Sequence, residues 1–264
     1  AGNNHLVTNL TPGQYYRFYA YGKGFKRIKS NYNVKNILLK VEQWGTTEWI
    51  SFEQAFLDCI NLDVTATDIP NLSGVLNMRQ MFKNCTSLKF DNANINDWDA
   101  SLATNMSEMF CGATSFNKSI GGMKLKKLVN MEKILDNTAI DCDNMSATLV
   151  AWKAQANANS NLNGVVINTL SNTVYYNEQG RDAVAFLKSP PFNWNISGGE
   201  VLLNCDLEKS YFITDWKVSA SKKIKFPAKT KSNGKYTLKY VQLDANGDTT
   251  GTPITINNAV SGHV

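Results

Sequence analysis

One short motif occurs four times in the first half of this chain of 264 residues, and it constrains the fold more than any other feature. Successive copies start 26, 28 and 25 residues apart. A unit of this length cannot bury its apolar side alone, so it is stable only when neighbouring units stack. We therefore expect the copies to form consecutive layers of one structure. They read SFEQAFLDCINL (51–62), NMRQMFKNCTSL (77–88), NMSEMFCGATSF (105–116) and NMEKILDNTAI (130–140).

Each copy opens with a residue that favours the start of a helix, and in three copies Gln or Glu follows three positions later. This is the capping-box pattern, in which the two side chains satisfy free backbone N–H groups at a helix N-terminus. The pattern predicts a short helical turn in each copy. The first residues are Ser51, Asn77, Asn105 and Asn130, and the later residues are Gln54, Gln80 and Glu108.

Apolar residues then follow with the spacing of an inward face. Pairs four residues apart fall on one side of a helical turn, and we expect Phe82 and Phe110 to lie near each other in neighbouring copies. The runs LDVTA and LKFD alternate as a strand with one buried face does. They predict that Asp63, Lys89 and Asp91 point outward. A further match at a spacing of 25 predicts that Trp98 is a core residue.

These residues carry a resemblance to a known family. The stretch VEQWGTTEWISFEQAFLDCINLDVTATDIPNL (41–72), the later NM-x-x-MF units and DWDAS resemble bacterial surface leucine-rich-repeat proteins of the BspA type. The resemblance covers roughly residues 36–200 and implies a repeat array in a secreted or surface protein. This chain has about four repeats, and the last has lost its Phe. An array this short needs caps, and residues 141–159 and 178–188 have the pattern of capping helices.

The two ends of the chain have the character of β-strands. Residues 13–43 contain aromatic and β-branched runs, and a similar style returns after residue 206, with Asn246-Gly247 as a hairpin turn. Both flanks resemble parts of PKD-like, immunoglobulin-type surface domains. That resemblance implies incomplete β modules, which could pair strands between molecules.

Together these observations predict an α/β leucine-rich-repeat-type solenoid with short strands and short helices, flanked by all-β, immunoglobulin-like segments. The predicted domains are β strands of a PKD-like module or N-terminal cap (1–35), a BspA-type solenoid with a C-terminal helical cap (36–205), and an all-β module (206–264).

Composition excludes some classes of function. The net charge of +5 includes only four arginines, so the planar groups that bind phosphates and base edges are scarce, and we expect no nucleic-acid partner. Lysines cluster between residues 222 and 239, which indicates either a polyanion-binding stripe or solvated strand edges. No apolar run reaches the roughly 18 residues of a membrane span, and no signal segment opens the chain. We expect no direct insertion into a membrane.

The five cysteines do not have the spacing of a metal site. Cys59 and Cys85 occupy the same position of the motif. We expect two small buried thiols in neighbouring layers, and a disulfide between them is the alternative.

An inventory of reactive residues argues against catalysis. The only histidines, His5 and His263, lie at the chain ends, so a Ser-His-Asp or Cys-His site in the folded body is not expected. Asp97 and Asp99 could act as paired carboxylates on one strand face, although polar turn corners explain them as well. The spacing of 244–248 is that of a calcium loop, but a hairpin turn explains it too. We predict no enzyme activity, no cofactor and no metal site.

Surface recognition remains as the expected function. Outward positions of neighbouring layers form a ladder, and the candidate binding residues are Asp63, Lys89, Asp91 and Asn117. They are also explained as solvated polar residues. We expect an extracellular or cell-surface bacterial module that binds a protein or glycan, and the BspA resemblance implies adhesion. The alternatives are an accessory domain of a carbohydrate-active enzyme and a purely structural stalk.

Overall fold

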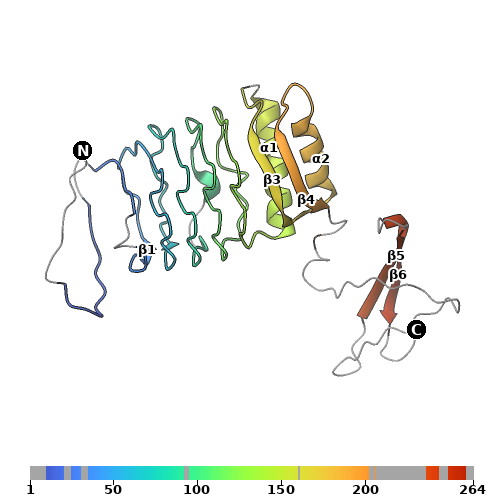
Figure 1. The fold of residues 1–264 in the computed structure, drawn as a ribbon, viewed down its shortest axis with the longest axis horizontal. Coiled ribbons are helices and arrows are strands. Elements are labelled where there is room, and N and C mark those ends of the chain that lie inside the picture. Colours follow the sequence, from blue (N-terminus) through green and yellow to red (C-terminus); the bar gives the residue numbers. More distant parts are fainter. Residues whose placement is uncertain are drawn as a thin grey trace. The chain divides into compact units, whose positions relative to one another are not determined.

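The computed structural model divides the chain into two compact units, Ala1–Tyr211 (unit 1) and Phe212–Val264 (unit 2). Each unit is described by itself (Figure 1). The residues that the structure describes are 10–20, 25–30, 35–91, 95–159, 161–201, 205, 236–243 and 249–259.

The repeats of unit 1 stack in sequence order, one layer against the next (Figure 1). The rings of Phe56 and Phe82 are stacked with centroids 5.4 Å apart, and those of Phe82 and Phe110 are 5.7 Å apart. The expected proximity of Phe82 and Phe110 is therefore confirmed. Trp98 is buried, as predicted, and the core of the unit runs through the interior of all the layers.

Each copy of the motif folds into two consecutive four-residue turns. In the first copy, Ala55 N donates to Phe52 O at 3.1 Å and Cys59 N donates to Phe56 O at 3.1 Å. The third residue of each turn has positive φ, 56° at Gln54 and 60° at Asp58. A positive φ at this position is what a type II turn requires. The same two positions have positive φ in the other copies, at Gln80, Asn84, Glu108, Gly112, Lys133 and Asn137.

The remaining backbone N–H groups of these turns bind the next layer. Gln54 N donates to Arg79 O at 2.9 Å, and Phe56 N donates to Met81 O at 2.9 Å. The second copy repeats the pattern toward the third, since Gln80 N donates to Ser107 O at 3.0 Å. Backbone donors that a helix would satisfy internally are thus satisfied between layers.

The predicted α/β leucine-rich-repeat-type solenoid with short strands and short helices, flanked by immunoglobulin-like segments, is wrong. Among the described residues, α-helices occur only after the four copies, the strand pair inside the repeats has two residues per strand, and no immunoglobulin-type sandwich is present. The physical reason lies in the motif. The left-handed residue inside each expected helix ends the helical turn, and the Asn that opens a copy forms a shorter bond instead of a helix cap. Asn77 Oδ1 accepts from Arg79 N, two residues on, at 2.9 Å.

Among the described residues of this part, the only regular strands are β1 (Lys40–Val41) and β2 (Asp63–Val64), which pair in parallel. One 3₁₀ turn, η1 (Ile95–Asp97), follows them. The strands expected between residues 13 and 43 are present only as β1 within the described ranges. The structure also shows an earlier layer that the motif does not reveal. Arg27 forms a parallel bridge with Ser51, so the stack begins one layer before the first recognised copy.

The segment after the repeats contains α1 (Cys142–Ala158), β3 (Val166–Tyr176), α2 (Glu178–Lys188) and β4 (Asn195–Val201). Both capping helices are confirmed. Asp141 caps α1 by accepting from Asn144 N at 2.9 Å, and Asn177 caps α2 by accepting from Gly180 N at 3.1 Å. Strands β3 and β4 pair in parallel, and Asn130 bridges to Val166. The ladder between layers therefore continues into this cap.

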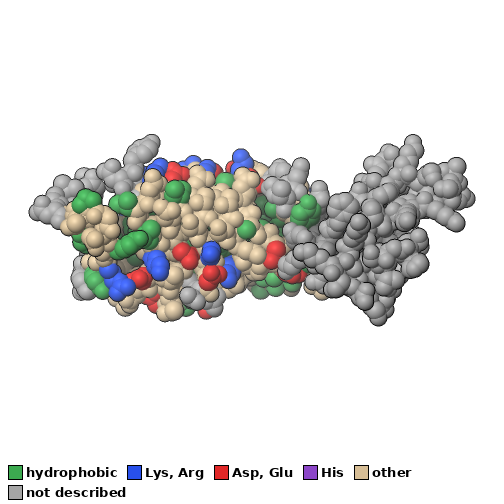
Figure 2. All heavy atoms as spheres, turned by 90° about the horizontal axis from the view of Figure 1, so that it is seen from below, with side chains coloured by type: hydrophobic (Ala, Val, Ile, Leu, Met, Phe, Trp, Pro, Cys, Tyr) green, Lys and Arg blue, Asp and Glu red, His purple; other side chains and the backbone are tan. Residues whose placement is uncertain are grey.

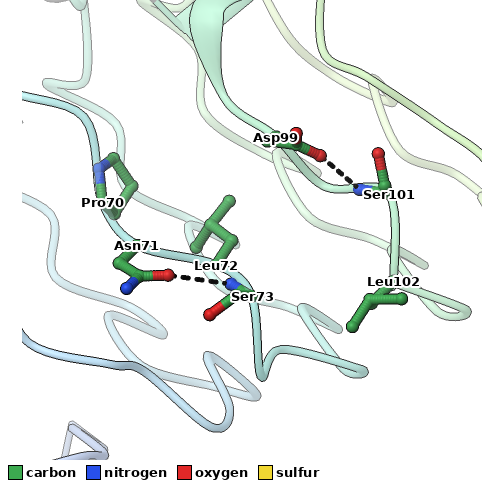
Figure 3. Close-up of a pocket in the computed structure, with 7 residues that line it drawn as sticks. All are labelled: Pro70, Asn71, Leu72, Ser73, Asp99, Ser101 and Leu102. Atoms are coloured by element: carbon green, nitrogen blue, oxygen red, sulfur yellow. Dashed lines mark hydrogen bonds between the residues drawn. The ribbon is translucent and has the colours of Figure 1, made fainter.

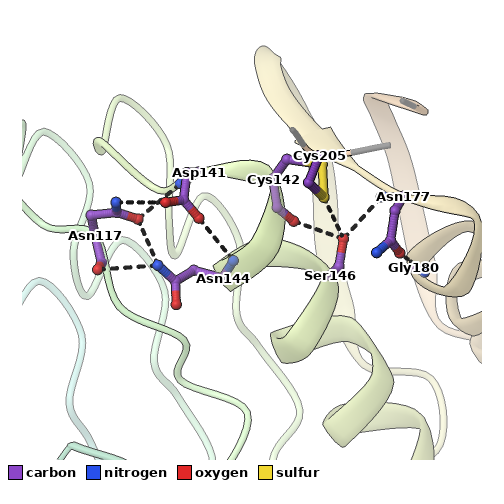
Figure 4. The surroundings of a disulfide bond; sticks show 8 residues. All are labelled: Asn117, Asp141, Cys142, Asn144, Ser146, Asn177, Gly180 and Cys205. Carbon is purple, nitrogen blue, oxygen red and sulfur yellow. Dashed lines mark hydrogen bonds between the residues drawn. A yellow bond between two sulfur atoms is a disulfide. The ribbon is translucent and has the colours of Figure 1, made fainter. Parts of the chain in front are cut away.

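A disulfide that was not expected joins Cys142 at the start of α1 to Cys205 (Figure 4). Ser146 lies beside it: its hydroxyl donates to Cys142 O at 2.7 Å and accepts from Asn177 N at 2.9 Å. The serine connects α1 to the N-cap residue of α2, and the disulfide connects α1 to the chain beyond β4. Cys59 and Cys85 are buried free thiols, as predicted.

Within unit 2 the structure describes one antiparallel pair, β5 (Tyr236–Leu243) and β6 (Thr249–Ala259). The hairpin expected around Asn246-Gly247 is confirmed by these strands, although the turn residues themselves lie outside the described ranges. The predicted domain boundaries after residues 35 and 205 stay predictions.

Candidate functional site

Two of the four predicted binding residues meet at the boundary between layers. Asp63 follows the buried Leu62, and Lys89 takes the equivalent place in the next layer. Asp63 Oδ1 accepts from the backbone N–H groups of Lys89 at 2.9 Å and Phe90 at 3.1 Å. The carboxylate therefore holds the next layer, while the side chain of Lys89 is exposed.

The other two predicted residues also have partners inside the protein. Asp91 forms an ion pair with Lys118 at 3.6 Å. Asn117 Oδ1 accepts from Asp141 N and from Asn144 Nδ2, both at 2.9 Å, and its own Nδ2 donates to Asp141 Oδ2 at 2.9 Å (Figure 4). Asn117 thus attaches the segment that follows the third copy to the first turn of α1. Of the predicted ladder, Lys89 is the exposed member whose side chain has no bond within the described part of the chain.

A second polar row connects the layers at the first positive-φ position. Gln54 Nε2 donates to Gln80 Oε1 at 2.8 Å, and Gln80 Nε2 donates to Glu108 Oε1 at 3.1 Å. Lys83 forms an ion pair with Glu108, and its hydrogen bond is the main reason that the pKa of Glu108 is lowered. These side chains stabilise the stack and are not free to bind a ligand.

A shallow depression of about 350 Å³ lies between two neighbouring layers (Figure 3). Its lining combines apolar side chains with amide, carboxylate and hydroxyl groups. Asn71 Oδ1 accepts from Ser73 N at 3.1 Å, and Asp99 Oδ1 accepts from Ser101 N at 3.2 Å, so each layer supplies one such turn. The lining residues are Pro70, Asn71, Leu72, Ser73, Asp99, Ser101 and Leu102.

Asp99 is the one member of the suspected carboxylate pair that faces this depression. Hydrogen bonding by Ser101 is the largest cause of the lowered pKa of Asp99, and Lys124 lies 3.6 Å from its carboxylate. A glycosidase acid needs a raised pKa. Asp97 is the last residue of η1 and does not line the depression. These contacts favour a turn-forming role for Asp99.

Exposed aliphatic side chains recur at the position just before the copies of the motif. The residue directly before each copy of the motif is Ile50, Leu76, Thr104 or Val129, and the three aliphatic members are 51%, 56% and 57% exposed. Thr104 N donates to Leu76 O at 2.9 Å, and Val129 N donates to Thr104 O at 3.0 Å, so the row crosses neighbouring layers. We call these four residues the aliphatic row. Their recurrence before Ser or Asn was visible in the sequence, but only the structure shows that they face solvent.

The other features considered in the sequence are absent from the described residues or lie outside them. No group of three or more His, Cys, Asp or Glu that could hold a metal ion occurs among them, and the suspected calcium loop at 244–248 lies outside them. Within the same ranges, no helix has the length and apolar character to cross a membrane. Most of the lysine-rich segment 222–239 also lies outside the described residues.

One comparison with known proteins matches the repeats to a protein family, and none of the comparisons supplies an activity. No curated protein and no solved structure matches the chain. Residues 50–163, less than half of the chain, match the model of a family described as "Mycoplasma protein of unknown function, DUF285". The repeat-bearing part of unit 1 is therefore similar to a family whose description names no function.

Proposed function

We propose that this chain is a non-enzymatic, secreted or cell-surface module of a bacterium that binds a protein or glycan. The match of residues 50–163 and the resemblance of the repeat sequence to BspA-type surface proteins support this proposal. Adhesion is the role that the resemblance suggests. The β-like sequence patterns of the flanks suggest in addition that strands can pair between this module and a partner.

The observation that carries the proposal is the aliphatic row, of which Leu76 and Thr104 follow within three residues the two segments that line the depression, 70–73 and 99–102. Exposed apolar side chains that recur along one line are typical of interaction surfaces. Hydroxyl, amide and carboxylate groups at its side supply the few directed polar contacts that fix a bound partner. By contrast, the polar side chains of Gln54, Gln80 and Glu108 are engaged between layers.

The disulfide supports the extracellular part of the proposal. Such bonds persist in oxidising environments and are rare in the cytosol. Cys142 and Cys205 are both almost fully buried in unit 1, which suits a structural bond rather than a transient one.

The test is direct binding of purified protein to a panel of extracellular matrix proteins and to a glycan array. We expect Leu76→Ser combined with Val129→Ser to weaken binding by about tenfold or more, because central apolar contacts dominate interface energies. Val150→Ser, an exposed apolar residue on α1, is the matched control and should bind normally. Far-UV circular dichroism verifies that all variants fold.

The two alternatives give different results in the same assay. An accessory domain with its own chemistry would turn over a glycoside substrate and lose that activity on Asp99→Ala. A purely structural stalk would bind nothing on either panel. Binding that the Leu76 and Val129 changes leave intact would refute the role of the aliphatic row.

A further inference from the structure

The N-terminal end of the stack exposes apolar side chains in an unusual concentration. We call residues 25–30 and 35–44 the N-terminal layer and residues 10–20 the N-terminal arm. Ile37 of the layer is 70% exposed and Tyr15 of the arm is 87% exposed. Space-filling atoms on one face show several apolar side chains toward this end (Figure 2). The exposed large apolar residues of the arm and layer are Leu10, Tyr15, Tyr16, Phe18, Tyr19, Phe25, Ile37 and Leu39.

The opposite end of the stack is different because α1, β3, α2 and β4 cover it (Figure 1). There Trp152 and Trp194 are buried, their rings are 6.1 Å apart, and Trp194 Nε1 donates to Leu162 O at 2.8 Å. The N-terminal layer has no helix among its described residues. One end of the stack is thus capped and the other presents core-like side chains to solvent.

Two buried indoles near the N-terminal end lack a hydrogen-bond acceptor. Trp44 and Trp49 are only 4% and 5% exposed, yet neither Nε1 has a partner within the part of the chain that the structure describes. The ring of Trp49 contacts that of Phe25, with centroids 5.5 Å apart. Buried polar groups are normally satisfied, and one left without a partner lowers the stability of the fold. This end has the features of a surface that a further segment completes.

The edge of β1 can accept such a segment. Asp63 N donates to Leu39 O at 2.9 Å and Thr65 N donates to Val41 O at 3.0 Å, so Leu39 and Val41 point their carbonyls toward β2. Successive residues of a strand direct their backbone groups to opposite edges. The N–H and C=O of Lys40 therefore face the other edge, where an extended chain could pair.

Charge indicates the chemistry of the segment. Three bases of the N-terminal layer pair with acids further along the chain: Lys26 with Glu48, Arg27 with Glu53, and Lys35 with Asp58. Lys29 and Lys40 are exposed and have no ion pair within the described part of the chain. The open end thus carries positive charge beside its apolar side chains.

We propose that the N-terminal layer binds an extended segment of a partner protein in which acidic residues alternate with apolar ones. The segment pairs with the free edge of β1, its apolar side chains cover Phe25, Ile37 and Leu39, and its carboxylates meet Lys29 and Lys40. This deepens the strand-pairing part of the proposed function by naming the partner's chemistry. A second copy of the chain fits less well, because two such ends would bring the same lysines together.

The experiment uses the full chain and a short fluorescent peptide in which Glu alternates with Val and Tyr. We expect saturable binding by fluorescence anisotropy, weakened by salt, with slower hydrogen exchange around Lys40. Lys29→Glu combined with Lys40→Glu should reduce the affinity for this peptide by about tenfold. The same double variant should bind more tightly a peptide in which Lys replaces Glu. Lys126→Glu with Lys127→Glu, two exposed lysines of a later layer, is the matched control and should bind as the unaltered protein does.

Three results would overturn the proposal: equal binding of the acidic and basic peptides, exchange protection away from the N-terminal layer, or a dimer in sedimentation equilibrium that the two charge reversals strengthen. Leu76→Ser distinguishes peptide binding at the N-terminal layer from partner binding at the aliphatic row. If the peptide binds only the N-terminal layer, this variant should bind it as the unaltered protein does. Loss of protein or glycan binding in that variant concerns the row alone.

Discussion

At the scale of single residues, the motif owes its shape to two left-handed positions. Non-glycine residues occupy most of them, although an L-residue pays roughly 1–2 kcal/mol for this conformation. Gln80 adopts this conformation, and its side chain forms hydrogen bonds with Gln54 on one side and with Glu108 on the other. The side chain thus compensates between layers for strain within its own layer.

This geometry predicts an unusual order of substitutions at Gln80. Gln80→Gly should be more stable than Gln80→Ala by about 1 kcal/mol, because glycine adopts positive φ without steric cost and both lose the side-chain bonds. Urea unfolding followed by tryptophan fluorescence measures the difference. At Val150, on α1, the order should reverse, since glycine is about 1 kcal/mol worse than alanine inside a helix. An alanine preference at both positions would contradict the double turn.

Glu108 predicts a dependence of stability on pH. Its folded pKa is lowered, chiefly by the hydrogen bond from Lys83, from an ordinary value of 4.5. The unfolded chain therefore binds the proton more readily, so this contribution is complete above pH 4.5 and is lost as the pH falls through the lower folded value. Glu108→Gln should flatten the fall in unfolding free energy below pH 4.5. Glu178→Gln, at an exposed carboxylate that pairs with Arg181, is the matched substitution for comparison.

At the scale of elements, the end of the stack depends on α1 and its disulfide. Asn117 and Asn144 attach the first turn of α1 to the last layers, and Cys142–Cys205 closes a loop with a sequence separation of 63. Gln155 Nε2 adds bonds to Gly121 O at 2.7 Å and Met123 O at 2.9 Å. The helix is therefore fastened to the layers along its length and not only at its cap.

Thiol chemistry tests these assignments. Burial raises the pKa of Cys59 to about 11 and raises that of Cys85 further, and burial also raises the pKa of Cys111, which is partly exposed. In the native protein, iodoacetamide should label Cys111 first, and Cys59 and Cys85 only after unfolding. Mass spectrometry of an unreduced digest should show Cys142 linked to Cys205. Free Cys205 in protein prepared under oxidising conditions would contradict the structure.

Loss of the disulfide should be costly to unit 1. Replacing Cys142 and Cys205 with serine should lower its free energy of unfolding by about 4 kcal/mol, because the unfolded chain regains the entropy of a long loop. Urea denaturation measures this. Cys111→Ser, at a free thiol, is the control and should change stability little.

At the scale of the whole molecule, the chain consists of two units, and five of its six tryptophans, at 44, 49, 98, 152 and 194, belong to unit 1. All the layers and both helices also lie in unit 1. We therefore expect a fragment ending at residue 211 to keep the melting temperature that tryptophan fluorescence reports for the full chain. A marked decrease would mean that unit 2 contributes to the folding of unit 1. A two-stranded sheet such as β5–β6 is marginally stable by itself, so unit 2 needs more than the described pair.

The sequence by itself determined which residues are buried and that the repeats stack. The period of the motif predicts the burial of Phe82, Phe110, Trp98 and the free thiols of Cys59 and Cys85. Apolar side chains at equivalent positions of stacked repeats are buried together. The capping helices followed from the helical pattern of residues 141–159 and 178–188. These properties depend on local pattern, which a sequence displays directly.

Only the tertiary structure decided the conformation of each repeat and the state of its surface. A capping-box pattern and an Asn turn use the same residue types, and the turn prevails here because backbone N–H groups find carbonyls in the next layer rather than four residues back. For the same reason Asp63 and Asn117 bind neighbouring layers, and Ile50, Leu76 and Val129 face solvent. The Cys142–Cys205 bond likewise joins residues brought together only by the packing of the cap. Such choices depend on partners distant in the chain, which the local pattern does not specify.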